Sequence, residues 1–390
     1  DLGSGNVQDI EELFKGKKVF ILDHHQPKKE KVDENIIHIN PHLFGIDGSN
    51  EVSGAGVSYF FSRELDNRIK RMAAIAIVGA IGDAQEHNGF SELNNEILED
   101  AIAEGTMKVE KGIKLFGYQT RALHKLLQFC SDPVIPDVTG NEKGAITFLK
   151  ELGIYGNGNE SKKLTEISRE EVDVLVDGII QKIGNGKKRE DIMWNNYILP
   201  EEDEKHMKEV REFSTLLNAC GRMEKATIGV GACLGDKEMK KKAVSILSEY
   251  KSEIMKAMEW FNDNRKKGNV IEKEGYIIIN ALDKIRGSII GTLASLIAKS
   301  GKVKDEVYIM SMGHLIDGNT KISLRISGRK RREDVDLRGI MKEAIEKSGF
   351  GEYGGHKYAA GALVPTANED SFLDIVKQVL DKRSLEEGVL

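Results

Sequence analysis

Over the first hundred residues, apolar and polar positions switch between strand-like and helix-like patterns. Residues 18–22 are a short apolar run with β-branched and aromatic side chains, which predicts a fully buried strand, and residues 36–40 predict a second strand. Residues 53–65 place apolar side chains on one helical face, and residues 72–81 form an apolar, alanine-rich run; both predict helices. Strands that alternate with helices are typical of an α/β layer built on a parallel sheet.

The pattern changes between about residue 93 and residue 200. Helical stretches are separated there by loops that carry glycine, asparagine and proline. The stretches cover residues 120–129, 144–152 and 169–183, and residues 153–160 form the clearest break. We therefore predict a mainly helical inserted domain.

The remainder of the chain predicts a second α/β region. Apolar runs at 276–280 and 306–311 predict strands, and alternation over 321–327 predicts a strand with one solvated face. Helices are expected at 207–220, 236–264, 337–347 and 371–383. The predicted fold class is thus α/β, with domains at residues 1–100, 101–200 and 201–390.

The amino-acid composition excludes some classes of protein. The 390 residues are 40% hydrophobic and 31% charged, which allows a packed core. Fifty-seven basic and 63 acidic residues give a net charge of −6, which excludes a globally basic nucleic-acid binder, so any phosphate contact must come from a local patch. Three cysteines without metal-ligand spacing suit a reducing cytoplasm, and no apolar run is long enough for a membrane span.

Candidate metal ligands follow the predicted strands. Asp23, His24 and His25 come directly after the run at 18–22, where sites form in open parallel sheets. Asp83 follows a glycine at the end of the apolar helix, and Asp1 opens a Gly-Ser-Gly loop that reads as the end of a strand, so we expect a further segment upstream. Carboxylates with imidazoles suit Mn²⁺ or Mg²⁺. For each feature alone, a surface turn or a helix cap is the alternative.

A second set of candidates lies near the end of the chain. Gly354 and Gly355 precede His356, and two glycines let backbone N–H groups approach an anion closely. Polar side chains that share one side of the preceding strand are Arg325, Ser327 and Arg329. Two guanidinium groups there can clamp a phosphate, and the alternative is a solvated strand beside a glycine-rich turn.

These motifs together resemble the DHH phosphoesterase superfamily with its DHHA1 domain. Within it, the sequence resembles the archaeal RecJ-like single-strand exonucleases, including the GINS-associated nuclease type. Residues 216–222 and the helical insert support that branch. The resemblance implies a DHH lobe at 1–100, an inserted domain at 101–200 and a DHHA1 lobe at 201–390, with the active cleft between the lobes.

The resemblance also implies roles for the candidate residues. Asp1, His24 and Asp83 would bind metal, in a site for two Mn²⁺ or Mg²⁺ ions, while Asp23 and His25 would orient ligands or contact the substrate in catalysis. The phosphate would be held by Arg325, Ser327, Arg329, Gly354, Gly355 and His356. The family has an earlier motif with two aspartates, upstream of the position that matches Asp1, and nothing in this sequence matches it. One metal position is therefore expected to be weak and hydrolysis slow.

The function implied is a metal-dependent exonuclease that hydrolyses single-stranded DNA or RNA, in DNA replication or repair. The expected partners are single-stranded nucleic acid and replication proteins such as GINS, in the cytoplasm. Two alternatives remain open: a non-catalytic replisome scaffold of the same fold, and a phosphodiesterase for oligonucleotides or cyclic dinucleotides.

Overall fold

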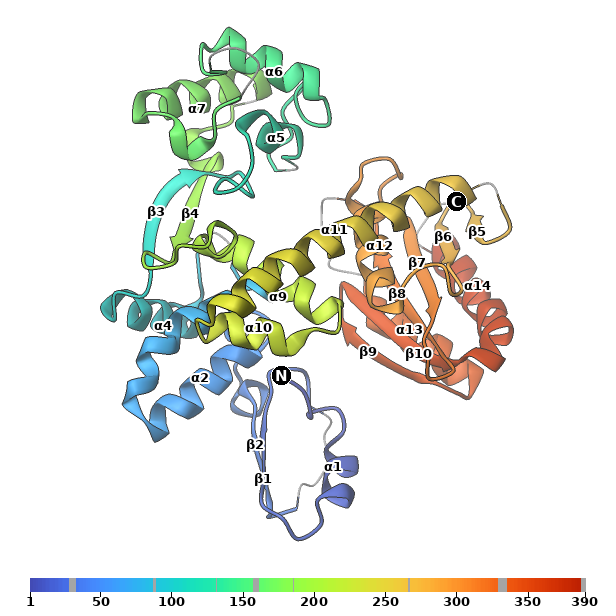
Figure 1. Ribbon diagram of the computed structural model, residues 1–390. Coiled ribbons are helices and arrows are strands. Elements are labelled where there is room, and N and C mark those ends of the chain that lie inside the picture. Colours follow the sequence, from blue (N-terminus) through green and yellow to red (C-terminus); the bar gives the residue numbers. More distant parts are fainter. Residues whose placement is uncertain are drawn as a thin grey trace. The chain divides into compact units, whose positions relative to one another are not determined.

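A computed structural model gives the structure of the protein (Figure 1). It describes residues 1–27, 33–86, 89–130, 132–156, 161–184, 186–265, 267–328 and 335–386. The chain forms two compact units. Unit 1 comprises Asp1–Gly221 and Ala226–Val244, and unit 2 comprises Arg222–Lys225 and Ser245–Leu390. The three-domain division at residues 100 and 200 stays a prediction. In the described part of the chain, no helix has both the length and the apolar character that a membrane crossing requires.

Unit 1 begins with a small parallel sheet. Strands β1 (Val19–Leu22) and β2 (Ile36–Ile39) lie in the two apolar runs and pair in parallel, with Val19 opposite Ile36. The full burial predicted for the first strand is wrong, because only Ile21 of β1 is buried and Phe20 is exposed. Helix α1 (Val7–Leu13) packs on this pair through a core of Val7, Ile21 and Ile36. The two strands run in the same direction, so Asp23 and Asn40 both follow a strand at the same edge of the sheet.

Three helices follow the sheet in unit 1. They are α2 (Gly54–Leu65), α3 (Ala73–Gly82) and α4 (Glu92–Ala103). The Ser53 hydroxyl accepts a hydrogen bond from the Gly56 amide and caps α2. Helix α3 packs against both α2 and α4, and six of its ten residues are buried because nearly all of them are apolar. It ends at Gly82 and so delivers Asp83 directly after its last turn.

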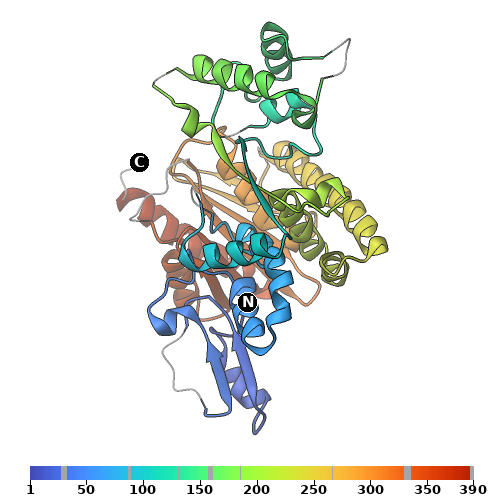
Figure 2. The ribbon, with the colours of Figure 1, turned by 90° about the vertical axis from the view of Figure 1, so that its left-hand side faces the viewer.

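A mainly helical segment occupies the middle of unit 1. Helices α5 (Leu123–Gln128), α6 (Glu142–Glu151) and α7 (Arg169–Ile183) share one apolar core. Strands β3 (Lys108–Ile113) and β4 (Met193–Ile198) pair antiparallel and connect this segment to the rest of the unit (Figure 1, and Figure 2 from the side). Neither strand is predicted from the sequence, because β3 is polar and exposed along most of its length and has no alternating pattern.

Four helices complete unit 1 and lead into unit 2. They are α8 (Lys205–Lys208), α9 (Val210–Arg222), α10 (Ala226–Cys233) and α11 (Lys237–Asn264). The single helix predicted over 207–220 is wrong, because Glu209 adopts an extended conformation and forms a bridge with Ile198. The last residue of α9 and the second part of α11 belong to unit 2.

Unit 2 is built on a six-stranded mixed sheet. The strand order is β5-β6-β7-β8-β10-β9, in which β6 and β7 are parallel and all other neighbours are antiparallel. The strands are β5 (Val270–Glu272), β6 (Tyr276–Asn280), β7 (Tyr308–His314), β8 (Asn319–Ile326), β9 (Glu352–His356) and β10 (Ala359–Pro365).

Helices cover both faces of this sheet. Helices α13 (Leu337–Ser348) and α14 (Glu369–Glu386) pack on the face that carries Ile322 and Leu324. Helix α12 (Gly287–Lys299) packs on β7 and β8 from the other face, beside Ser323 and Arg325. The solvated face predicted for 321–327 is therefore wrong: α12 covers it, and Ser323 and Ser327 are buried there.

Candidate metal and phosphate sites

Asp23 organises the turn that follows β1. Its carboxylate is buried and accepts hydrogen bonds from the backbone N–H groups of Ser4, His24 and His25 at 3.0, 2.8 and 3.2 Å. The Nδ1–H of His25 donates a fourth, at 2.7 Å. Burial alone would raise the pKa of Asp23, but the bonds from His25 and Ser4 hold this pKa well below its usual range. Asp23 is thus an ionised group whose carboxylate accepts four hydrogen bonds.

His24 is buried with both ring nitrogens engaged. Its Nδ1 donates to the backbone oxygen of Gly48 at 2.8 Å, which fixes the tautomer and leaves Nε2 without a proton in the neutral ring. Nε2 then faces a carboxylate oxygen of Asp1 at 3.0 Å. A backbone carbonyl that accepts from one nitrogen of a histidine is the usual partner of a metal ligand.

The loop at Gly48 can approach His24 this closely only without a side chain. A Cβ at this position would lie 2.3 Å from the backbone oxygen of His24. The buried amide of Gln85 donates to the same Gly48 oxygen at 3.0 Å and to the Asp83 carboxylate at 2.9 Å. The segments that carry His24 and Asp83 are therefore tied to one backbone atom.

Asp1 and Asp83 lie at opposite edges of the His24 ring. Asp1 faces Nε2, whereas Oδ2 of Asp83 lies 3.6 Å from Nδ1. The side chain of Asp1 is 71% exposed and lies at the start of α2, where a Cβ on Gly54 would be 2.4 Å from its oxygen. Burial raises the pKa of Asp83, and the imidazoles of His24 and His25 lower it in part.

The residues present fit a hard divalent cation. Asp1, Asp23, His24 and His25 each offer a ligand atom, and these four atoms lie within 4.8 Å of one another. An unprotonated Nε2 and a carboxylate oxygen 3.0 Å apart repel each other unless a proton or a cation lies between them. Mixed oxygen and imidazole ligands suit Mn²⁺, and Mg²⁺ less strongly. Metal binding by Asp1, His24 and Asp83 stays a prediction.

The sequence analysis does not identify a polar network behind this cluster. Asn40 donates to the hydroxyl of Ser4 and to the backbone oxygen of His25, both at 2.8 Å. The Ser4 hydroxyl is 2.8 Å from Nε2 of His38, whose pKa is lowered by burial although Asp23 opposes the shift. The position of Asn40 after a buried strand could have revealed it, as for Asp23. Ser4, Gly48 and Gln85 carry no such signal.

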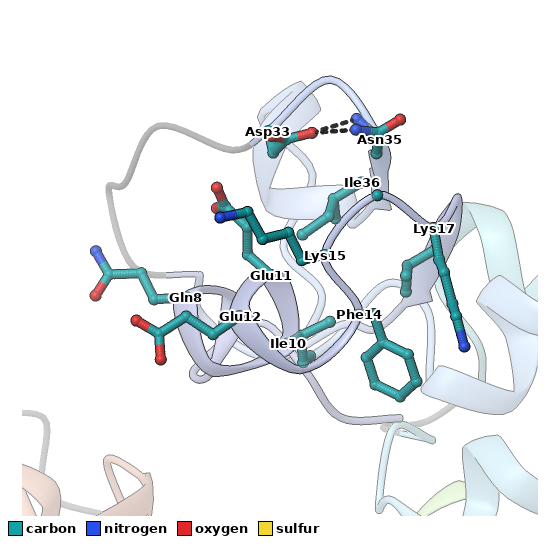
Figure 3. Close-up of a pocket in the computed structure, with 12 residues that line it drawn as sticks. Gln8, Ile10, Glu11, Glu12, Phe14, Lys15, Lys17, Asp33, Asn35 and Ile36 are labelled. Atoms are coloured by element: carbon teal, nitrogen blue, oxygen red, sulfur yellow. Dashed lines mark hydrogen bonds between the residues drawn. The ribbon is translucent and has the colours of Figure 1, made fainter.

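A hollow in unit 1 lies at the other end of the same strands. It has a volume of about 420 Å³ and lies between α1 and the starts of β1 and β2, next to Val19 and Ile36 (Figure 3). Side chains of both charges line it, among them Glu11 and Lys15. Sites in parallel sheets form at the carboxyl ends of strands, so this hollow is not the candidate active site.

In unit 2, the glycine motif lies on a strand. Gly354, Gly355 and His356 belong to the edge strand β9, although the sequence suggests a turn. Glycine is a weak strand former, which hides the strand from pattern analysis. Gly355 has φ +113°, and a Cβ there would lie 2.3 Å from the backbone oxygen of Ala359, so the hairpin with β10 requires a glycine.

The register places Arg325 on the same face of the sheet as His356. Ala359 pairs with His356, and Ala360 pairs with Leu324, so the next position along β8 is Arg325. Side chains directly opposite each other in antiparallel strands point to the same face. The row across these three strands is therefore Arg325, Ala359 and His356.

Arg325 is partly buried and is part of a cluster of cations. It donates to the Ser295 hydroxyl at 3.0 Å and to the backbone oxygens of Leu324 and Ala360. Burial, and then the charge of Arg222, lowers the pKa of both Arg325 and Lys321. Among the described residues, none of these three cations has a carboxylate partner. The sequence analysis does not identify Lys321 or Arg222 as site residues.

The other predicted phosphate ligands are placed differently. The Ser327 hydroxyl is buried, donates to the backbone oxygen of Lys304 at 2.5 Å and accepts from the Val307 amide at 2.8 Å. The hydroxyl proton of Ser327 is used within the fold, so this residue has no proton to donate to a phosphate. Arg329 lies outside the described residues.

Family models match two stretches of the chain. A DHH-CID domain matches residues 115–205, and a DHHA1 domain matches residues 274–382. Among solved structures, RecJ from Thermus thermophilus in complex with Mn²⁺ is similar with a TM-score of 0.55 and 17% identity, over 98% of this chain and 44% of that chain. CDC45 from Entamoeba histolytica is similar with a TM-score of 0.58 and 11% identity, over 96% of this chain and 82% of that chain.

At these identities the structures show the fold alone, and this chain spans less than half of the length of the Thermus RecJ chain. A curated relative is more similar in sequence. The uncharacterised protein MJ0831 of Methanocaldococcus jannaschii is 31% identical over 388 residues, which cover 98% of this chain and 80% of that protein. Together with the two matching domain models, these findings show that the chain belongs to the same family as MJ0831, within the DHH/DHHA1 superfamily, and that its fold resembles that of RecJ.

Proposed function

We propose that this protein is a metal-dependent exonuclease that hydrolyses phosphodiester bonds in single-stranded DNA or RNA. The observation that carries the proposal is the pair of His24 and Asp1, because Nε2 faces the carboxylate oxygen at 3.0 Å while Nδ1 is committed to Gly48. A cation bound by both atoms would remove the repulsion between the unprotonated nitrogen and the carboxylate oxygen. Crystals of the structurally similar RecJ contain Mn²⁺, which agrees with the choice of ion.

In unit 1, each residue has a distinct proposed role. Asp1, His24 and Asp83 would hold one or two Mn²⁺ or Mg²⁺ ions. When bound, such ions lower the pKa of a water and offset charge that develops on the phosphoryl oxygens. Asp23 holds the turn in place through its four hydrogen bonds and fixes the His25 ring through Nδ1. His25, oriented in this way, would orient a ligand or contact the substrate.

In unit 2, the cations would hold the nucleic-acid backbone. Arg325, Lys321 and Arg222 lack carboxylate partners among the described residues, so an anion would find their charges uncompensated. His356 and the backbone amides of Gly354 and Gly355 lie on the edge strand of the same sheet. Contacts of this type are made to phosphates, so we expect little sequence preference.

The biological setting belongs to the same proposal. Roles in DNA replication or repair, a cytoplasmic location and contact with replication proteins such as GINS follow from the family resemblance.

The test compares the wild-type chain with His24→Ala and with the control His206→Ala. His206 also pairs with a carboxylate, that of Glu204, but lies on α8, outside the cluster. Mn²⁺ binding is measured by calorimetry, and hydrolysis by release of nucleotides from strands labelled at either end. We expect the Mn²⁺ affinity and the hydrolysis rate of His24→Ala to fall roughly a hundredfold. Loss of a group that only supports a metal ligand already costs up to about that factor.

Three outcomes would contradict the proposal. Equal cleavage by wild type and His24→Ala would exclude the metal role of His24. A wild-type chain that binds no Mn²⁺ and cleaves nothing would point to the non-catalytic scaffold. Turnover of dinucleotides or cyclic dinucleotides far above that of long strands would point to the short-substrate phosphodiesterase.

A further inference from the structure

A cavity in unit 1 adjoins the turn that carries Asp83 and has no assigned occupant. Its volume is about 380 Å³, within the range of small-ligand pockets. The end of α3 and the start of the following turn form one wall, α9 forms another, and Phe116 and Trp194 supply aromatic side chains. The lining residues are Ile81, Gly82, Ala84, Glu86, Phe116, Trp194, Arg211, Ser214, Thr215 and Asn218.

The positive charge in the lining of this cavity, that of Arg211, is compensated by neighbouring carboxylates. Arg211 lies between two acidic side chains: its guanidinium is 2.6 Å from a Glu86 oxygen and 3.1 Å from a Glu209 oxygen. The same guanidinium stacks on Trp194, 3.8 Å from the ring centroid. A phosphate would meet no free positive charge here and would face the carboxylate of Glu86. The lining therefore disfavours an anion and favours a neutral, polar ligand.

The indole N–H of Trp194 in the lining is buried and has no hydrogen-bond partner among the described residues. The side chain of Ser214 is more than nine-tenths buried, and no described residue forms a hydrogen bond with its hydroxyl. The hydroxyl lies beside Gly82, where a Cβ would be 2.8 Å away, so the absence of a side chain there keeps the approach open. A buried donor such as the Trp194 indole N–H is costly without a partner, and a ligand in the cavity that accepts a hydrogen bond from it would remove that cost.

From these features we infer that the cavity receives a nucleobase of the substrate. A base is neutral and planar, carries both donors and acceptors for Ser214 and Asn218, and has flat faces that pack on aromatic rings such as Phe116. The cavity is next to Asp83, so a nucleotide held at the acidic and imidazole cluster has its base within reach. The inference rests on the proposed function, since it assumes a nucleic-acid substrate.

The test uses the fluorescence of Trp194. The chain has two tryptophans, so Trp260→Phe leaves Trp194 as the only reporter. The full chain with this change is titrated with adenosine in EDTA, so that neither the metal nor the phosphate site takes part, and ribose 5-phosphate is the control ligand. We expect a saturable change with adenosine and none with ribose 5-phosphate.

Two further variants examine the lining. Phe116→Ala removes an aromatic side chain that is 41% exposed, and Ser214→Ala removes only the hydroxyl. We expect each to weaken adenosine binding roughly tenfold, from lost stacking and from a lost hydrogen bond respectively. Ser58→Ala, on α2 outside the cavity, is the matched control and should leave the affinity unchanged.

The inference is overturned if adenosine gives no saturable change, if ribose 5-phosphate gives the same change, or if both lining variants bind adenosine as tightly as the control does. These outcomes are distinct from failure of the proposed function. A chain that hydrolyses single strands but ignores adenosine loses only the base pocket. A chain that binds adenosine but neither binds Mn²⁺ nor cleaves keeps the pocket and loses the nuclease.

Discussion

A single carboxylate, that of Asp23, holds together the turn that presents both histidines. Its hydrogen bonds come from three backbone amides and one ring nitrogen, so every partner is a donor. Asparagine has nearly the same shape, but it would turn an NH₂ group toward some of these donors and remove the charge. The acidity of Asp23 is therefore part of the local fold as well as of the chemistry.

We predict that Asp23→Asn lowers the free energy of unfolding of unit 1 by about 3 kcal/mol at neutral pH. The pKa of Asp23 is depressed in the folded protein, so its contribution is fully present above the ordinary carboxyl pKa of about 3.9 and is lost as the pH falls below it. Urea unfolding in EDTA should show the difference between variant and wild type shrinking from pH 5 toward pH 2.5, values chosen to span about 3.9. A pH-independent difference would show that ionisation of Asp23 is not the cause.

Gly48 is a second residue on which the cluster depends, although it has no side chain. We predict that Gly48→Ala destabilises unit 1 by about 2 kcal/mol, because the new methyl group must displace the backbone of His24. Hydrolysis and Mn²⁺ affinity should fall with it. Gly5→Ala is the matched control, since nothing lies within 4 Å of its added Cβ. Equal stability of the two variants would disprove the close packing of this loop.

At the scale of elements, the edge hairpin of β9 and β10 depends on one of two adjacent glycines. Gly355 combines a positive φ with a close approach to Ala359, whereas Gly354 has neither a positive φ nor a neighbour within 4 Å of an added Cβ. Gly355→Ala should destabilise the hairpin by about 2 kcal/mol, and Gly354→Ala should not. Hydrogen exchange of the β9 and β10 amides measures the difference, and similar exchange in both variants would contradict it.

Elements with a strong internal pattern could be predicted from the sequence. The apolar run of β6 and the amphipathic helix α7 both match their predicted ranges, because their own residues determine the pattern. Strand β3 could not be predicted, since it is polar and is held by pairing with β4, about eighty residues later in the chain. The break at Glu209 also depends on a distant partner, Ile198.

The same distinction holds for the candidate site: residues that follow an apolar run could be predicted, and residues from segments without a pattern could not. The Asp23-His24-His25 triplet and Asp83 stand out because they follow apolar runs. The structure brings the triplet together with Asp1, whereas Asp83 lies beside Nδ1 of His24, outside this group of four. Gly48 and Gln85 come from segments without a pattern, so only the folded chain shows their contact with His24 and Asp83. Ser327 shows the converse: its place in an alternating pattern suggests an open side chain, yet its hydroxyl is used within the fold.

For the whole molecule, the net charge of −6 opposes binding to nucleic acid, so affinity must come from the local cations of unit 2. We predict that binding of single-stranded DNA weakens steeply with salt. Arg325→Met should reduce the slope of log affinity against log salt by about 0.7, the value for one lost phosphate contact on a single strand. Fluorescence anisotropy at several salt concentrations measures both slopes. Lys284→Met, which removes a cation paired with Asp283, is the control, and identical slopes for all three proteins would exclude Arg325 as a phosphate contact.

Helix α11 also has a practical consequence. The last of the boundaries between the two units along the chain falls between Val244 and Ser245, inside this helix of 28 residues. A protease needs an unfolded stretch of chain to cut, and a continuous helix with buried residues on both sides of the boundary, such as Ala243 and Leu247, offers none there. Limited proteolysis will therefore cleave surface loops elsewhere before it cleaves α11. A separation of the two units has to cut through this helix, because no exposed loop lies between Val244 and Ser245.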